Sequence, residues 1–226
     1  MGYRSIKAVL ERDYSTNYSY GKIQRLLKIM GIKAIQKKKS KPTTDETFEK
    51  SAENLLEQDF STTKPNEKWS IDITYLPHGT SRSYMVGIKD MFDKNIISYK
   101  ISKNMKMEFV RECLIEAFSK TNAEGVIIQS DQGGHFTNRT YYTILEQHGA
   151  IASTSRRGKC LDNSPIESFW KLLKNEYLYL KNPRTFEELV SGIAEYVNYY
   201  NKKRYQQQLS WSAPSEYRDR NLFFFS

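Results

Sequence analysis

The sequence predicts an α/β fold, with a three-stranded antiparallel meander plus two further strands, helices on both faces, and a small helical module in front. Three observations support this prediction. Apolar and polar residues alternate at strand period over 69–75, and two more strand-like runs follow before the next helix. Beyond residue 107, amphipathic helices alternate with short apolar strands. The first 41 residues differ from the rest in both pattern and charge.

The first zone, 1–42, contains two short helical patterns. Ile6, Val9 and Leu10 form an apolar stripe at helical spacing, Ser19 is placed to cap a second helix, and Gly31 follows where that helix would end. Two short helices joined by a polar turn predict a helix-turn-helix-like DNA-binding module. The pattern fits a plain helical hairpin that packs on the rest of the chain equally well.

Charge separates this zone from the remainder. The formal net charge of +9 comes from 35 Lys and Arg against 26 Asp and Glu. Residues 1–41 hold eleven of the cations and two acidic residues, so residues 42–226 hold 24 of each sign. The zone ends in the run Lys37, Lys38, Lys39 and Lys41. Such a cluster indicates binding to nucleic acid, and these four lysines are expected DNA contacts, with a solvated basic face as the alternative.

Two further segments follow the basic module. A linker helix is expected over 43–64, where Leu55, Leu56 and Phe60 form an apolar edge until Pro65 ends the helix. The α/β core then covers 65–226. Its predicted strands lie at 69–75, 84–88, 96–101, 126–128 and 151–155, and its helices at 108–120, 139–148, 164–179 and from 185 onward.

Composition excludes several classes of protein. No apolar run approaches the roughly eighteen residues of a membrane span, and no secretory signal follows Met1, so we expect a cytoplasmic protein. Cys113 and Cys160 are the two cysteines, which excludes a disulfide framework and a cysteine-rich zinc site. The histidines lack zinc-ligand spacing and are interpreted as surface or turn residues: His78, His135 and His148.

Three carboxylates are the candidate catalytic residues, although each has an ordinary alternative. Asp72 lies inside the first strand and could be a solvent-facing strand residue. Asp131 follows the fourth strand and could be a turn residue before two glycines. Glu167 lies in the first turn of a helix, where Ser164-Pro-Ile-Glu167 fits a capping box.

Taken together, the three carboxylates indicate a metal-dependent reaction. The first and fourth strands can lie side by side, which would bring Asp72 and Asp131 to one edge, and Glu167 follows Asp131 with thirty-five residues between them (167 − 131 = 36). Three carboxylates without histidine suit Mg²⁺ or Mn²⁺, and two such ions can clamp the attacking and leaving oxygens of a phosphoryl transfer. Asp90 and Asp93 compete for the first place, but Asp72 lies on the polar face of its strand.

Two lysines extend the candidate site along the helix. Lys171 and Lys174 lie four and seven residues after Glu167, on the same helical face. Cations at this position can hold DNA phosphates beside a metal site, so both are predicted DNA contacts. A helical ion pair is the alternative for each.

Five segments carry a resemblance to a known family. They read GYRSI, TKPNEKWSIDITYLP, IIQSDQGGHF, LDNSPIESFWKLLKNEYL and YYNKKRYQQQLSWSAPSEY, and they cover nearly the whole chain in order. The chain resembles bacterial insertion-sequence transposases of the IS-three type, in the Asp-Asp-thirty-five-Glu branch akin to retroviral integrases. The resemblance implies a ribonuclease-H-like integrase catalytic core over 65–226, divalent metal, and DNA cleavage and joining at element ends. Asp72, Asp131 and Glu167 correspond to the metal-binding triad and Lys174 to a DNA contact.

The resemblance also implies partners and leaves alternatives open. The expected partners are the terminal repeats of the element and target DNA, bound by a homo-multimer that associates with the nucleoid. Many relatives have a histidine where this chain has Gln206-Gln207-Gln208, so this segment departs from the family pattern. A non-catalytic DNA-binding remnant that acts as a regulator, and a nuclease that cuts without joining, are the rival hypotheses.

Overall fold

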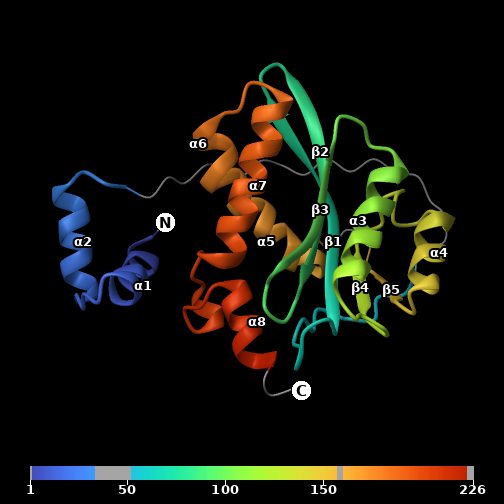
Figure 1. The fold of residues 1–226 in the computed structure, drawn as a ribbon, viewed down its shortest axis with the longest axis horizontal. Helices are drawn as coiled ribbons and strands as arrows, with labels where there is room; N and C mark the ends of the chain where they lie inside the picture. Colours follow the sequence, from blue (N-terminus) through green and yellow to red (C-terminus); the bar gives the residue numbers. More distant parts are fainter. Residues whose placement is uncertain (1, 34–51, 157–159, 223–226) are drawn as a thin grey trace.

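The computed structural model describes residues 2–33, 52–156 and 160–222 (Figure 1). A central five-stranded sheet separates two groups of helices, and the N-terminal module lies at one side of the molecule. The elements in chain order are α1 (Tyr3–Asp13), α2 (Tyr20–Ile29), β1 (Lys68–His78), β2 (Ser81–Asp90), β3 (Ile96–Ser102), α3 (Met107–Lys120), β4 (Ile127–Ser130), α4 (Arg139–Gln147), β5 (Ile151–Thr154), η1 (Cys160–Asn163), α5 (Ser164–Leu173), the π-helical turn η2 (Lys174–Leu178), α6 (Tyr179–Lys181), α7 (Phe186–Lys202), η3 (Gln207–Leu209) and α8 (Pro214–Leu222).

The sheet has the strand order β3-β2-β1-β4-β5. β1, β2 and β3 form the predicted antiparallel meander, and β4 and β5 add to it in parallel. The first hairpin is longer than the sequence pattern indicated, because pairing continues from Trp69 opposite Asp90 to His78 opposite Ser81. Gly79, with a φ of +51°, supplies the left-handed conformation that the tight turn needs. β1 therefore lies at the centre of the sheet, beside both β2 and β4.

Both faces of the sheet are covered. Odd-numbered residues of β1, such as Trp69 and Ile71, pack with α3 and α4 in one core, whereas Leu76 packs with α5 and α7 in the other. The face of β1 that the sequence marked as polar is therefore buried too: Ser70 is 0% and Thr74 is 6% exposed. Polar residues on this face lie against α5 and are shielded from water. Their polar atoms therefore need hydrogen-bond partners within the protein.

The expected linker helix is not formed over the part of 43–64 that the structure describes. Residues 52–64 form bends and turns, and 43–51 lie outside the described residues. The segment instead runs beside β5: Thr154 donates a backbone hydrogen bond to the Glu53 carbonyl, and Leu55 N–H donates to Ser153 Oγ. Leu56 is 3% exposed. Pairing with the sheet edge and burial of Leu56 favour an extended path over a helix.

The N-terminal module has the two expected helices. Ser19 Oγ accepts a hydrogen bond from Lys22 N–H at the start of α2, and Gly31 has a φ of +67° just after its end. Lys37, Lys38, Lys39 and Lys41 lie outside the described residues. Within the described part of the chain, no helix is both long enough and apolar enough to cross a membrane.

The C-terminal helices differ from the sequence prediction in two respects, and one histidine differs as well. The helix expected over 164–179 is divided into α5, η2 and α6 by the π-helical turn, and α8 was not predicted. His78, interpreted as a surface or turn residue, is 7% exposed at the end of β1, where its ring lies 6.2 Å from that of Phe186. The prediction for His78 was wrong because β1 continues three residues beyond the alternating run and its last residue is covered by α7.

Candidate active site

Asp72 and Asp131 lie at the same level of adjacent parallel strands. The register pairs Lys68 with Ile127 and Ser70 with Gln129, an offset of 59 residues, and continuing it by two positions brings Asp72 level with Asp131. Asp72 is in the middle of β1 and Asp131 is the first residue after β4. Sheet pairing thus brings together two carboxylates that are 59 residues apart in sequence.

Glu167 joins them from the first turn of α5, which packs on β1 and β2. The capping-box alternative does not describe this turn, because Ser164 is already inside the helix and Asn163 is the N-cap residue without a side-chain capping hydrogen bond. Asn163 instead bonds to β1: its Oδ1 accepts from Ser70 Oγ at 2.7 Å, and its Nδ2 donates to the Ile71 carbonyl at 3.1 Å. The start of α5 is therefore fixed to the strand that carries Asp72.

Lys89 of β2 fixes the same turn from a second side. It is 3% exposed, and its Nζ donates to the Pro165 carbonyl at 2.8 Å and to Ser168 Oγ at 3.1 Å. Burial, and to a lesser extent the charges of Lys94 and Arg204, lower the pKa of Lys89 to about 7. Sequence reasoning did not find Lys89, since the lysine lies within a run typical of an ordinary strand end.

The three carboxylates influence one another electrostatically. Burial, then the charges of Asp131 and Glu167, raise the pKa of Asp72 to about 7. Burial also raises the pKa of Asp131 and of Glu167, the latter with a contribution from the Asp131 charge. Among the described residues, no group of three or more His, Cys, Asp or Glu side chains lies close enough together, as the side chains stand, to hold a metal ion. The carboxylates thus lie near the end of β4 and repel one another there.

Neighbouring groups orient two of these carboxylates. Trp170 of α5 donates its indole N–H to Asp72 Oδ2 at 2.9 Å, and Gly133 N–H donates to Asp131 Oδ1 at 2.9 Å. Gly87, opposite Asp72 in β2, makes room for the indole, because a Cβ there would lie 2.8 Å from Trp170 Cη2. Trp170 was missed by sequence reasoning, and a glycine inside a strand was the one available signal.

His135 approaches Asp131 from the loop after β4. Its Nε2 lies 2.8 Å from the Met105 carbonyl, and its ring meets that of Phe109 edge-on at 6.3 Å. Its charge lowers the pKa of Asp131, although burial outweighs it. His148 is exposed and stacks on Phe118 at 4.3 Å, away from this site.

The two helix lysines differ in their surroundings. Lys171 Nζ lies 3.9 Å from Glu167 Oε2, and the Lys171 side chain is 75% exposed. Lys174 is half-buried: burial lowers its pKa, while the charge of Asp72 raises it. Lys174 begins the π-helical turn, which widens the helix at this point. Short π-helical segments of this kind often occur at functional sites.

Asp90 and Asp93, the competitors of Asp72, belong to a different structure. Both are 0% exposed, and both bind Arg218 of α8, with an Arg218 to Asp90 Oδ2 distance of 2.6 Å. Their carboxylates therefore hold α8 against the β2–β3 corner.

Comparison with known proteins identifies the family. The family described as "Integrase core domain" matches residues 62–160, a second family of that description matches 167–222, and an "HTH-like domain" matches 1–40. A protein named as the InsK transposase of insertion sequence element IS150, from Escherichia coli strain K12, is 36% identical over 96% of this chain and 77% of its own length. The InsF transposase of IS3A from the same strain is 30% identical over 76% of this chain and 60% of its own length.

The chain belongs to the insertion-sequence transposases of the IS-three type. The resemblance seen in the sequence is confirmed. The fold of this transposase is similar to that of the catalytic core domain of HTLV-2 integrase in complex with magnesium, with a TM-score of 0.56, 16% identity, and coverage of 69% of this chain and 97% of that one. The ribonuclease-H-like fold class is confirmed as well.

Proposed function

We propose that this transposase cuts and joins DNA at the ends of an insertion sequence, and that Asp72, Asp131 and Glu167 hold the divalent metal for this phosphoryl transfer. One observation carries the proposal. β1, the end of β4 and the first turn of α5 bring these three carboxylates near one another, where the negative charges of neighbours raise the pKa of Asp72 and Glu167. A dication would relieve that repulsion.

The donor set fits Mg²⁺ or Mn²⁺. All three side chains offer hard oxygen atoms, and such ions activate the attacking oxygen and stabilise the leaving oxygen when bound. The chain's own residues prepare the ligands: Trp170 and the Gly133 N–H each orient one carboxylate by a 2.9 Å hydrogen bond. The proposal includes two such ions.

DNA is the proposed partner of both parts of the chain. The HTH-like module and its basic run, Lys37, Lys38, Lys39 and Lys41, would bind the terminal repeat, while Lys171 and Lys174 would hold phosphates beside the carboxylates. In this proposal Lys171 exchanges its contact with Glu167 for a phosphate once metal neutralises the carboxylate. Target DNA would enter at the same site, and a homo-multimer would bring two element ends together.

A strand-transfer assay tests this function. Labelled element ends and plasmid target are incubated with the full chain and Mg²⁺ or Mn²⁺, and cleaved and joined products are counted separately. Asp72→Asn, Asp131→Asn and Glu167→Gln should each lower both steps by at least about a hundredfold while the thermal unfolding midpoint stays within a few degrees. Near-normal joining by Glu167→Gln would show that the site assignment is wrong. Tight DNA binding without either product would favour the regulator hypothesis.

A further inference from the structure

The end of α1 contacts the loop between α7 and α8 and the first turn of α8. Arg12 donates hydrogen bonds to the Trp211 main-chain carbonyl and to Glu216 Oε1, 2.5 Å away, and its guanidinium lies 4.3 Å from the centre of the Tyr205 ring. Asp13 accepts a 2.6 Å hydrogen bond from the Tyr205 hydroxyl. Four contacts thus converge on two adjacent residues of the N-terminal module. We call residues 205–216 the docking corner.

The docking corner has a defined backbone. Gln206 N–H donates to the Ser212 carbonyl at 3.1 Å, and Trp211 N–H donates to the Gln206 carbonyl at 2.9 Å. Ser210 and Trp211 both have positive φ, +52° and +59°, which is unfavourable for residues other than glycine. Such strain persists only where the surrounding structure fixes it. The closed turn holds the Trp211 carbonyl where it receives the hydrogen bond from Arg12, and the segment Gln206–Gln208 forms part of that turn.

The charges at the docking corner are complementary. Partial burial raises the pKa of Glu216, but hydrogen bonds from Arg12 and the Ala213 N–H outweigh it, so the pKa lies below its ordinary value. The hydrogen bond to Glu216 raises the pKa of Arg12. Both side chains are less than one-third exposed, at 29% and 28%. The carboxylate therefore stays charged opposite the guanidinium throughout the neutral pH range.

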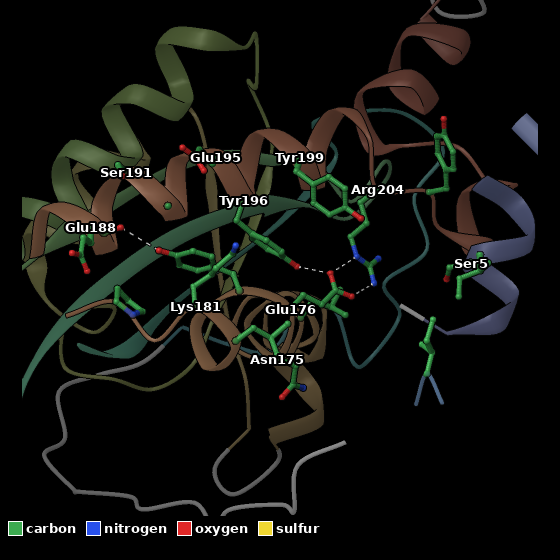
Figure 2. Close-up of a pocket in the computed structure, with 18 of the residues that line it drawn as sticks. Ser5, Asn175, Glu176, Lys181, Glu188, Ser191, Glu195, Tyr196, Tyr199 and Arg204 are labelled. Atoms are coloured by element: carbon green, nitrogen blue, oxygen red, sulfur yellow. Dashed lines mark hydrogen bonds and ion pairs between the residues drawn. The ribbon is translucent and has the colours of Figure 1, made fainter. Parts of the chain in front are cut away.

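Beside this contact, a cavity separates part of the module from the helices. This cavity, of about 1110 Å³, has Ser5 and Lys33 on the module side and Glu176 and Arg204 on the other (Figure 2). Arg204 binds Glu176 with two 2.8 Å hydrogen bonds, which fixes that wall. The contact at Arg12 and Asp13 is therefore a narrow attachment beside an open space, and such an attachment sets an orientation without burying the module.

We propose that the docking corner is the binding surface for the N-terminal module of the same chain, with Arg12 as its anchor, and that this attachment sets the orientation of the module relative to the candidate carboxylates. The orientation part rests on the proposed function, because it matters only if DNA bound by the module reaches Asp72, Asp131 and Glu167. The attachment part stands on the contacts alone.

Hydrogen–deuterium exchange of the full chain tests the attachment without DNA or metal. Arg12→Ala and Glu216→Gln should each speed exchange of the α1 amides about threefold to fivefold while α3 is unchanged. The double variant should exchange no faster than Arg12→Ala alone, since both changes remove one shared contact. Arg4→Ala is the matched control, because Arg4 lies on α1, is exposed, and contacts the Tyr3 ring of its own helix. Equal exchange in Arg4→Ala and Arg12→Ala would overturn the attachment.

Strand transfer by Glu216→Gln tests the orientation, since this change leaves the cations of the module in place. DNA affinity should stay within about twofold, while joining should fall about tenfold because the bound end is misplaced. Faster α1 exchange with undiminished joining would overturn the orientation part. If the unaltered chain joins no DNA at all, the proposed function fails, and the exchange result still decides the attachment. A mixture of ¹⁵N-labelled and unlabelled chains tests whether the docking is within one chain. Contacts between α1 of one copy and the docking corner of another copy would overturn docking within one chain.

Discussion

At the residue scale, the contact between Trp170 and Asp72 makes a specific prediction. Trp170→Phe removes the indole N–H that bonds Asp72 Oδ2 while it keeps an aromatic ring above Gly87. A less well-oriented ligand should weaken Mn²⁺ affinity and lower strand cleavage, each about tenfold. Calorimetric titration with Mn²⁺ measures the affinity independently of activity.

Trp69→Phe is the matched control for this substitution. Trp69 is fully buried on the opposite face of β1, and its indole nitrogen has no hydrogen-bond partner within the described part of the chain. It should lower stability without changing Mn²⁺ affinity. Equal losses of affinity in the two variants would mean that Trp170 acts through packing alone.

Lys89 predicts a pH dependence of stability. Burial lowers its pKa to about 7 from an ordinary value of 10.5, so the unfolded chain binds more protons than the folded one between these pH values. The free energy of unfolding should therefore rise with pH over this range, by about 2 kcal/mol between pH 7 and 9 from this one group. Urea unfolding of the parent and of Lys89→Met at both pH values measures the difference. Parallel pH profiles for the two proteins would contradict the prediction.

At the scale of elements, α8 depends on one arginine. Arg218 neutralises Asp90 and Asp93, which are both fully buried, so Arg218→Met should lower the free energy of unfolding by about 3–5 kcal/mol. Urea unfolding measures this loss. Adding Asp90→Asn and Asp93→Asn should restore part of it, because the uncompensated charges are then removed.

Arg220→Met is the control on the same helix. Arg220 is 59% exposed and pairs with Glu216, so its loss should cost about 1 kcal/mol or less. Equal destabilisation by the two arginine variants would show that the buried pair contributes no more than a surface contact.

Sequence patterns predicted the elements with strong periodicity and failed where tertiary contacts decide. The strands around Asp72 and the helix after Ser164 follow from alternation, apolar stripes and helix-start residues. The bends over 52–64 do not, because pairing with β5 overrides local helix propensity. α8 has few apolar residues to mark it, and it is held by a charge pair that forms only in the folded chain.

The candidate site, too, could be predicted from the sequence only in part. The spacing of Asp72, Asp131 and Glu167 and the family resemblance sufficed to propose them together. Trp170, Lys89 and their contacts could not be predicted, since they depend on how α5 lies across β1 and β2. The π-helical turn at Lys174 likewise has no periodic signal, because it is one widened turn within a continuous helical pattern.

At the scale of the whole molecule, the uneven charge predicts how DNA affinity depends on salt. The formal net charge of +9 lies entirely in residues 1–41. If about five of the eleven cations there contact phosphates, log affinity should fall with log salt at a slope of about −4 to −5. Substituting Lys37, Lys38, Lys39 and Lys41 by glutamine should flatten that slope by about three to four units. Fluorescence anisotropy over a salt series measures it.

The four-lysine variant should leave the stability of the core unchanged, which urea unfolding can check. A slope that stays the same would mean that the run is a solvated segment and that phosphates are bound by the core. In that event Lys171 and Lys174 would be the first residues to test, since both lie beside the candidate carboxylates.

The path of residues 52–55 along β5 has a consequence for assembly. β5 is the last strand of the sheet, and its outer side is occupied by the chain itself through the bonds of Thr154 and Ser153. Exposed strand edges are where separate chains most readily add to one another's sheets. This edge is closed to such addition, so copies of the transposase that meet on DNA would have to touch through helices, loops or the other edge. A sequence change that frees 52–55 should accordingly make the protein prone to aggregate.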